Sequence, residues 1–215
     1  MPRRPENEER VKAMYSAEDK WRRKYGYVAG VDEVGRGPMA GPVVAAAVVL
    51  PASSMISGID DSKKLSQKSR ERLFDEILEN CLAFGVGIRS SQYIDKYGIV
   101  PATFSAMRMA IDMLTLKGYR PGFVAVDGYP IPCLDIPQEA VVHGDSLVAS
   151  IACASIVAKV TRDRIMTEYA ELYPDYGFEE HKGYCTKEHR SRLSRFGPCP
   201  IHRRSFRPVG DAADA

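Results

Sequence analysis

The sequence predicts an α/β protein in which helices pack on a mixed β-sheet. Short valine-rich runs bounded by Gly and Pro are typical of strands, and longer runs with apolar residues at helical spacing alternate with them. With 215 residues, 45% of them hydrophobic, the chain is long enough for one substantial core and short for two domains. We therefore expect one folded domain over 27–208.

The first expected elements lie around the start of this domain. Residues 1–26 are charge-rich with a sparse apolar stripe, which predicts a helix that lies on the body of the protein or frays. Two valine-rich strands are expected at 27–34 and 42–50, and Gly-Pro pairs mark the turn between them.

The later elements alternate along the chain. Ser66 is a candidate N-cap for a helix to about Asn80, and Pro101 opens a helix that Gly118 ends. The remaining expectations are strands at 84–88, 123–127 and 140–142, a helix rich in small residues from 146 to about 172, a last helix at 186–196 and a disordered tail at 209–215. Five strands in this order predict a mixed sheet.

Composition limits the classes of function. The formal net charge is only +2, so nucleic-acid binding would require a local basic face. The five cysteines include no C-x-x-C pair, which argues against a zinc site or a disulfide framework and favours a reducing, cytosolic setting. We expect no secretory signal, and the longest apolar run, 43–50, is too short to span a bilayer.

Four acidic residues stand out by their position. Asp32 and Glu33 lie inside an otherwise apolar strand, Asp127 ends a later strand, and Asp145 precedes the long helix. A buried carboxylate is costly without compensation, and a bound cation would supply it. Carboxylate oxygens suit Mg²⁺ or Mn²⁺. Two such ions can align an attacking water and a leaving oxygen across a phosphate.

Each acid also has a simpler interpretation. Asp145 could be the N-cap of the following helix, and Asp127, before Gly128, could be a turn residue. Neighbouring strand residues point to opposite faces of a sheet. Asp32 and Glu33 could therefore share one metal only if the strand bends or bulges there.

Other titratable residues are excluded from the predicted site. Asp163 lies on the same predicted helix as Asp145 but roughly 27 Å further along, so it is expected to pair with Arg162 or Lys159 instead. The four histidines show no metal-ligand spacing, and no Ser–His–Asp or Cys–His arrangement is visible.

Four further segments could contact a nucleic acid. Gly35-Arg36-Gly37 offers a guanidinium and bare backbone N–H groups to an anion, or is a tight turn with a solvated arginine. Ser62 and Lys63 could contact a phosphate, or belong to a solvated turn. The aromatic loop at 176–184 could stack on a base or pack on the core as a lid. The basic cluster at 202–207 is by default a solvated face, with backbone binding as the second interpretation.

Several long motifs follow one another in a fixed order between about 27 and 208. They are GVDEVGRGP at 30–38, GPVVAAAV at 41–48, DSKKLS at 61–66, VDG at 126–128, GDS at 144–146 with SIACASIVAKVTRD at 150–163, the segment 173–184, and HRRSF at 202–206. Together these motifs resemble the ribonuclease HII family, the type 2 ribonucleases H.

The resemblance implies an RNase H-like mixed five-stranded sheet with a C-terminal helical extension. It implies a site of four carboxylates, Asp32, Glu33, Asp127 and Asp145, that binds two Mg²⁺ or Mn²⁺ ions, with Asp32 bridging them. The implied activity is hydrolysis of the RNA strand of RNA–DNA hybrids, and cleavage 5′ of a single ribonucleotide embedded in duplex DNA. The products would carry 3′-hydroxyl and 5′-phosphate ends.

The resemblance also implies substrate contacts and partners. Gly35-Arg36-Gly37 would clamp the backbone at the ribonucleotide 2′-hydroxyl, Lys63 would hold a phosphate beside Ser62, and Tyr184 would stack at the RNA–DNA junction. The partners would be RNA–DNA hybrids and ribonucleotide-containing duplex DNA, with no membrane. No clamp-binding peptide is visible after Phe206. The protein is expected to be a cytoplasmic monomer.

Two rival interpretations remain open. One is a ribonuclease HIII-like nuclease, related in fold but poor at single ribonucleotides; the Gly-Arg-Gly triplet favours type 2. The other is a non-catalytic hybrid-binding protein on the same scaffold, which would be expected to lack one or more of the four acids.

Overall fold

The computed structural model describes residues 5–52 and 55–213. Its centre is a five-stranded sheet in the order β3-β2-β1-β4-β5, which confirms the predicted mixed sheet. The strands are β1 (Val28–Val34), β2 (Val43–Val49), β3 (Ala83–Arg89), β4 (Phe123–Asp127) and β5 (Gln138–Val141). β1 pairs antiparallel with β2 and parallel with β4.

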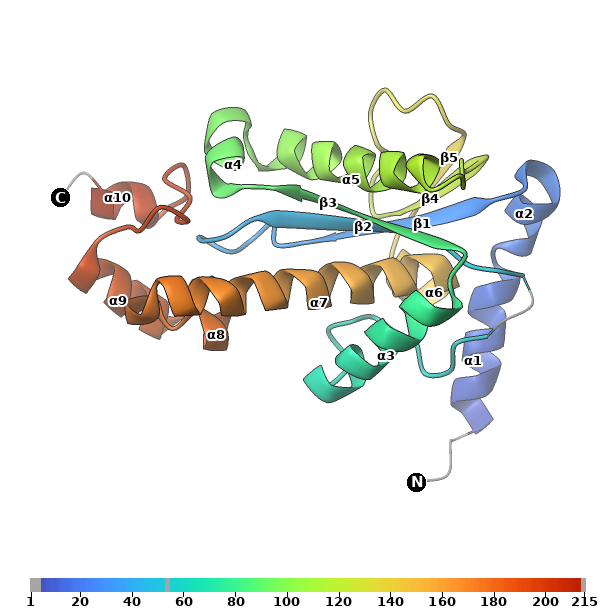
Figure 1. Cartoon of the computed structure of the whole chain (residues 1–215), viewed down its shortest axis with the longest axis horizontal. Coiled ribbons are helices and arrows are strands. Elements are labelled where there is room, and N and C mark those ends of the chain that lie inside the picture. The colour runs from blue at the N-terminus through green and yellow to red at the C-terminus, as the bar shows by residue number, and fades with distance from the viewer. Residues whose placement is uncertain (1–4, 53–54, 214–215) are drawn as a thin grey trace.

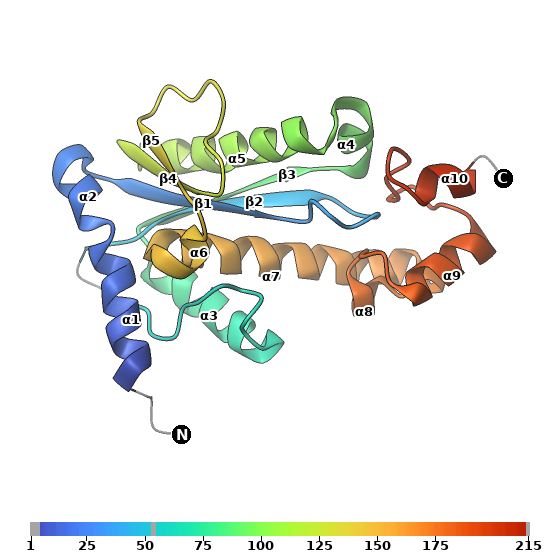
Figure 2. The same ribbon diagram turned by 180° about the vertical axis from the view of Figure 1, so that it is seen from behind.

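Helices cover both faces of the sheet (Figures 1 and 2). One face carries α4 (Ser91–Tyr97) and α5 (Ile99–Leu116). The long α7 (Ala149–Leu172) crosses the other face, with α3 (Gln67–Asn80) packed beside it. The C-terminal elements gather at one end of the molecule: η1 (Pro174–Tyr176), α8 (Phe178–His181), α9 (Lys187–Phe196) and α10 (Val209–Ala213).

The close approach of α7 to the sheet follows from small residues on both sides. The first half of α7 is rich in alanine and serine, and nearly every residue there is buried. A Cβ at Gly30 of β1 would collide with the backbone of Ser150 and Ile151. The predicted role of the small residues is therefore confirmed, and it brings the side chains of α7 directly against β1.

The N-terminal extension forms two helices, α1 (Pro5–Ser16) and α2 (Asp19–Tyr25), where one was expected. Both lie on the body of the protein at the end of the sheet away from α10 (Figures 1 and 2). Its first four residues lie outside the described part of the chain.

Three other elements differ from expectation. The helix expected from 146 to 172 is divided at Val148, whose backbone is extended, into the short α6 (Gly144–Leu147) and α7. Helix α4 was not anticipated. The tail was expected to be disordered, but 209–213 form α10 because Val209 is fully buried beside Met39 and Leu193. Residues 214 and 215 lie outside the described part.

Helix α5 is the one described helix whose length and hydropathy would suffice to cross a membrane. In the fold it packs along β1, β2 and β3 and buries residues such as Ala106, Ala110 and Leu114. This is the position of a core helix.

Candidate active site

Three carboxylates meet at one edge of the sheet. Asp32, Asp127 and Asp145 each offer an oxygen, and these oxygens all lie within 4.8 Å of one another. β1 and β4 are parallel neighbours, so their carboxyl ends lie side by side and carry Asp32 and Asp127 together. Asp145 arrives from the start of α6. An all-oxygen donor set of this size fits a hard divalent cation.

Asp32 is held by a chain of hydroxyl groups. Its carboxylate accepts a hydrogen bond from the Ser155 hydroxyl of α7, and from the backbone N–H of Glu33 at 2.7 Å. The Ser155 and Ser62 hydroxyl oxygens are 3.0 Å apart, so Ser62 donates in turn to Ser155. Ser62 was predicted to contact substrate. It is buried, and its hydroxyl supports Asp32 through Ser155.

Asp127 and Asp145 are joined through the backbone between them. An Asp127 side-chain oxygen accepts a hydrogen bond of 2.7 Å from the N–H of Gly144, which places the start of α6 against the end of β4. The alternative in which Asp145 is a helix cap does not hold. The N-cap of α6 is His143 and that of α7 is Val148.

Glu33 faces the other side of the sheet. The β1–β2 ladder pairs Asp32 with Ala46 and Glu33 with Ala45 in unbroken register. The bulge that would let both acids share one metal is therefore absent at this point. Glu33 instead forms an ion pair of 3.3 Å with Arg36.

A cavity of about 590 Å³ lies on this second face. Glu33, Arg36 and Asp127 supply its polar wall. Its apolar wall comes largely from α5, through Val100, Phe104 and Met107. The four carboxylates therefore lie on two faces of the sheet. Asp32, Asp127 and Asp145 lie together near α6 and α7, and Glu33 points towards α5.

The carboxylates repel one another in the absence of a cation. Burial, reinforced by the charges of Glu33 and Asp127, raises the pKa of Asp32 well above its usual range. Burial also raises the pKa of Glu33 and, with the charges of Asp61 and Asp127, that of Asp145. A bound cation would relieve this repulsion. The electrostatics thus agree with the donor geometry.

The pKa of Lys63 depends on the same group of carboxylates. Its partial burial acts to lower the pKa of its ammonium, but the surrounding carboxylates, Asp61 first and then Asp145, outweigh burial and raise that pKa. A cation held charged beside four acids is suited to a phosphate that enters the site. Asp61 belongs to the segment that the sequence predicts as a turn, and its side chain accepts a hydrogen bond of 2.9 Å from the Lys63 backbone N–H. Its charge beside Lys63 and Asp145 has no signal in the sequence.

The Gly35-Arg36-Gly37 segment, the clamp loop, is shaped from behind by two buried arginines. Arg203 donates to the carbonyls of Gly35, Arg36 and Gly41 at 2.6, 3.0 and 3.0 Å. Arg162 donates to the carbonyls of Pro42, Ala40 and Lys182 at 3.0, 3.1 and 2.9 Å. The expected solvated face at 202–207 is therefore wrong for His202 and Arg203, which are buried; Arg204 and Arg207 are exposed.

The aromatic loop at 176–184 packs on the core through some of its residues and leaves Tyr184 exposed. Tyr176 and Phe178 are buried and stack on each other, as a packed lid would. Tyr184 is 42% exposed, and the Gly183 carbonyl beside it accepts from Met39 N–H at 2.9 Å, next to the clamp loop. Tyr184 is therefore free to meet a ligand.

Asp163 lies outside the carboxylate cluster and forms an ion pair of 2.7 Å with Lys159, one of its two expected partners.

His189 and His202 are buried and hold the aromatic loop in place. The Nε2 atoms of His189 and His202 are 3.0 Å apart in a hydrogen bond, and His189 Nδ1 bonds the carbonyl of Tyr184 at 3.0 Å.

Comparisons with known proteins agree with this site. The family model described as Ribonuclease HII matches residues 29–209. Ribonuclease HII from Caldicellulosiruptor saccharolyticus is 52% identical over 182 residues, which is 85% of this chain and 87% of the relative. Ribonuclease HII from Desulfitobacterium hafniense is 47% identical over 207 residues, 96% of this chain and 78% of the relative.

A solved structure, the PCNA:RNase HII complex from Archaeoglobus fulgidus, superposes with a TM-score of 0.68 at 27% identity and covers 84% of this chain and 95% of that one. The shared fold, the acidic cluster and the identity over most of the chain lead to one conclusion. This chain belongs to the ribonuclease HII family and is a metal-dependent ribonuclease H that acts on RNA–DNA hybrids.

Proposed function

We propose that this chain also cuts duplex DNA on the 5′ side of a single embedded ribonucleotide, leaving 3′-hydroxyl and 5′-phosphate ends. The observation that carries the proposal is the position of Arg36 in the clamp loop, 3.3 Å from the Glu33 carboxylate. If the clamp loop contacts the 2′-hydroxyl, that contact would lie next to the carboxylates proposed to bind the metal ions. Reading a 2′-hydroxyl is how a protein distinguishes RNA from DNA at one position.

The carboxylates are the proposed metal ligands. Asp32, Asp127 and Asp145 would hold one Mg²⁺ or Mn²⁺ ion on the α7 side, and Glu33 would supply a carboxylate to a second ion from the α5 side. When bound, two such ions activate a water and stabilise the leaving 3′-oxygen. The chain itself keeps the ligands oriented: Ser155 fixes Asp32, and the Gly144 N–H fixes Asp127.

The remaining contacts would position the strand. Lys63 would hold a phosphate next to the carboxylates. Gly37 has no atom of the described chain within 4 Å of the place where a Cβ would stand, so the substrate backbone can approach closely there. Tyr184, exposed at the end of the lid, would stack at the RNA–DNA junction. Ser62 would act through Ser155 on Asp32.

The proposal is tested with three duplexes: DNA with one ribonucleotide, a long RNA–DNA hybrid, and DNA alone, each with Mg²⁺ or Mn²⁺. We expect cleavage of the first two. Asp32→Asn should abolish it, while Asp163→Asn, which removes a carboxylate outside the cluster, should not. Cleavage of the hybrid but not of the single-ribonucleotide duplex would support a ribonuclease HIII-like preference instead.

The same proposal includes a role in removing ribonucleotides from DNA, a cytoplasmic location and a monomeric enzyme. All five cysteines are unpaired, which supports a reducing compartment. Sedimentation of the pure protein tests the monomeric state.

A further inference from the structure

The N-terminal extension contacts segments next to three residues of the site, Lys63, Asp127 and Asp145. It lies outside the stretch matched by the family model, which begins at residue 29. Helices α1 and α2 contact the loop that bears Lys63, the junction of α6 and α7 that follows Asp145, and β4, which ends in Asp127. The contacts to each segment are specific hydrogen bonds, ion pairs or ring stacks.

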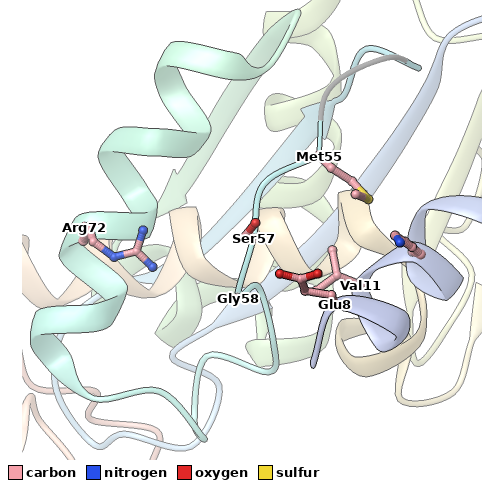
Figure 3. A pocket seen from close by; sticks show the side chains of 7 residues that line it. Glu8, Val11, Met55, Ser57, Gly58 and Arg72 are labelled. Atoms are coloured by element: carbon pink, nitrogen blue, oxygen red, sulfur yellow. The ribbon is translucent and has the colours of Figure 1, made fainter. Parts of the chain in front are cut away.

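The first contact is with the loop before Lys63. Arg10 of α1 forms an ion pair of 2.9 Å with Asp60 and donates to the carbonyl of Ile59 at 2.9 Å. The Tyr15 hydroxyl accepts from the Ile56 N–H at 3.0 Å. Figure 3 shows Val11 and Glu8 of α1 facing Met55, Ser57 and Gly58 of the same loop across a cavity of about 580 Å³.

The second contact caps α7, the helix whose Ser155 holds Asp32. Glu18, between α1 and α2, is fully buried, and one carboxylate oxygen accepts from the Ser150 N–H of α7 at 2.6 Å. Its other oxygen accepts from Arg22 at 2.6 Å. The first N–H groups of a helix have no partner within it, and Val148, the N-cap residue of α7, has no side chain that could accept them. Glu18 supplies the missing acceptor from another part of the chain.

The third contact joins β4 to the same helix start. Trp21 of α2 stacks on Phe123 of β4 with 5.0 Å between ring centroids, and it shares a buried cluster with Val148 and Ile151. Its indole N–H donates to Glu139 of β5 at 3.2 Å. One buried cluster therefore joins Trp21 to β4, which ends in Asp127, and to the residues that follow α6, which carries Asp145.

We propose that Glu18 is a positioning residue for the metal site: by capping α7 it fixes the α6–α7 junction, and with it Asp145, relative to Asp127. The inference rests on the proposed role of these two acids as metal ligands. Groups that orient metal ligands at one remove typically change metal affinity about 10- to 100-fold when lost. A charged acceptor at a helix N-terminus is also stronger than a neutral one.

The test compares Glu18→Ala, which removes the acceptor, with Glu18→Gln, which keeps a neutral one. Leu114→Ala is the matched control, because it opens a cavity in the core on the opposite face of the sheet. Two readouts that need no catalysis are Mn²⁺ binding by calorimetry and hydrogen exchange of the 142–152 segment without metal. Asp145→Asn gives the baseline for a damaged metal site.

We expect Mn²⁺ affinity to fall about 10-fold in Glu18→Ala and by a smaller factor in Glu18→Gln. Exchange over 142–152 should quicken in the same order, while Leu114→Ala changes neither. Affinity and exchange like those of the wild type in a folded Glu18→Ala, or equal losses in Leu114→Ala, would overturn the proposal. If Glu18→Ala does not fold, the Mn²⁺ affinity and the hydrogen exchange of Glu18→Gln, compared with those of the wild type, decide the test. Cleavage by the wild-type protein, measured in parallel, tests the proposed function separately.

Discussion

The guanidinium of Arg203 donates a hydrogen bond of 2.6 Å to the carbonyl oxygen of Gly35, a residue 168 positions earlier in the chain. Arg203 and Arg162 together reach six backbone carbonyls around the clamp loop, and no carboxylate of the described residues forms an ion pair with either. Burial lowers the pKa of Arg203 to about 9 and that of Arg162 to about 10, within the range where both stay charged at neutral pH.

Arg203→Lys should weaken cleavage at a single ribonucleotide more than cleavage of a long hybrid. A lysine ammonium cannot reproduce the planar fork that meets three carbonyls, so the clamp loop loses its support. Loss of a hydrogen bond from a charged donor is worth about 1.5–3 kcal/mol, or roughly 10- to 100-fold in kcat/KM. Steady-state kinetics on both substrates measure the ratio. Arg204→Lys, at an exposed neighbour, should leave it unchanged.

Gly35→Ala and Gly37→Ala should separate stability from substrate binding. Gly35 has φ +93°, and a Cβ there would collide with the Arg162 side chain, so alanine should lower the free energy of unfolding by about 1–3 kcal/mol. Gly37 meets nothing in the described chain, so alanine should spare stability and raise KM for the single-ribonucleotide duplex. Denaturant melts and kinetics distinguish the two. Equal stability losses would contradict this division.

Metal removal should destabilise the protein, and Asp32→Asn should change that response. Saturation with a ligand at about 100 times its Kd adds about 2.7 kcal/mol of stability. Asp32→Asn should lose the Mg²⁺-dependent rise in Tm. In EDTA its Tm should be higher than that of the wild type, because the substitution removes one of the buried charges that repel one another. Thermal melts with and without Mg²⁺ measure both effects. An unchanged Mg²⁺ response would remove Asp32 from the ligand set.

The raised carboxyl pKa values also fix how metal-free stability depends on pH. These groups bind protons more readily in the folded chain than in the unfolded one. Their contribution is therefore fully present below the unfolded carboxyl pKa of about 4, and it is lost as pH rises through the folded values. The Mg²⁺-dependent gain in Tm should accordingly grow from pH 5 to pH 8.

The His189–His202 pair should make the lid sensitive to acid. Burial lowers the pKa of His189 to about 3 and that of His202 to about 4, so both are neutral in the folded chain. Their contribution to stability is full above the unfolded pKa of about 6.5 and is lost as pH falls towards the folded values, by about 1.4 kcal/mol per pH unit for each histidine. Denaturant melts between pH 7 and 5 should show a shallower slope in His202→Gln.

The sequence predicts those parts of the fold that depend on neighbours along the chain. Ser66 caps α3 by accepting from the Ser69 N–H at 3.2 Å, and Thr186 caps α9 in the same way. The acids at the ends of β1 and β4 meet because parallel strands end together. These relationships follow from spacing, strand pattern and cap chemistry.

The parts that the sequence did not reveal depend on partners far away along the chain. The sequence around Arg203 predicts a solvated base, but in the structure its guanidinium is bonded to three backbone carbonyls around the clamp loop. Ser155 reads as one small helix residue among many, although its hydroxyl holds Asp32. Glu18 looks like part of a charged tail, and its acceptor role depends on a helix that begins 131 residues later, at Ala149. No local pattern encodes these contacts.

The alternation of Asp32 and Glu33 across the two faces of β1 has a consequence for insertions and deletions. A shift of the strand by one residue turns every side chain to the opposite face. Adding or removing one residue in the first half of β1 would carry Asp32 away from Ser155 and turn it towards α5. Adding or removing two residues would turn Asp32 back to its original face of the sheet, but it would shift Asp32 along the strand by two residues. In a library of length variants, the 28–32 segment should therefore tolerate no insertion or deletion, even at positions where a single substitution is accepted.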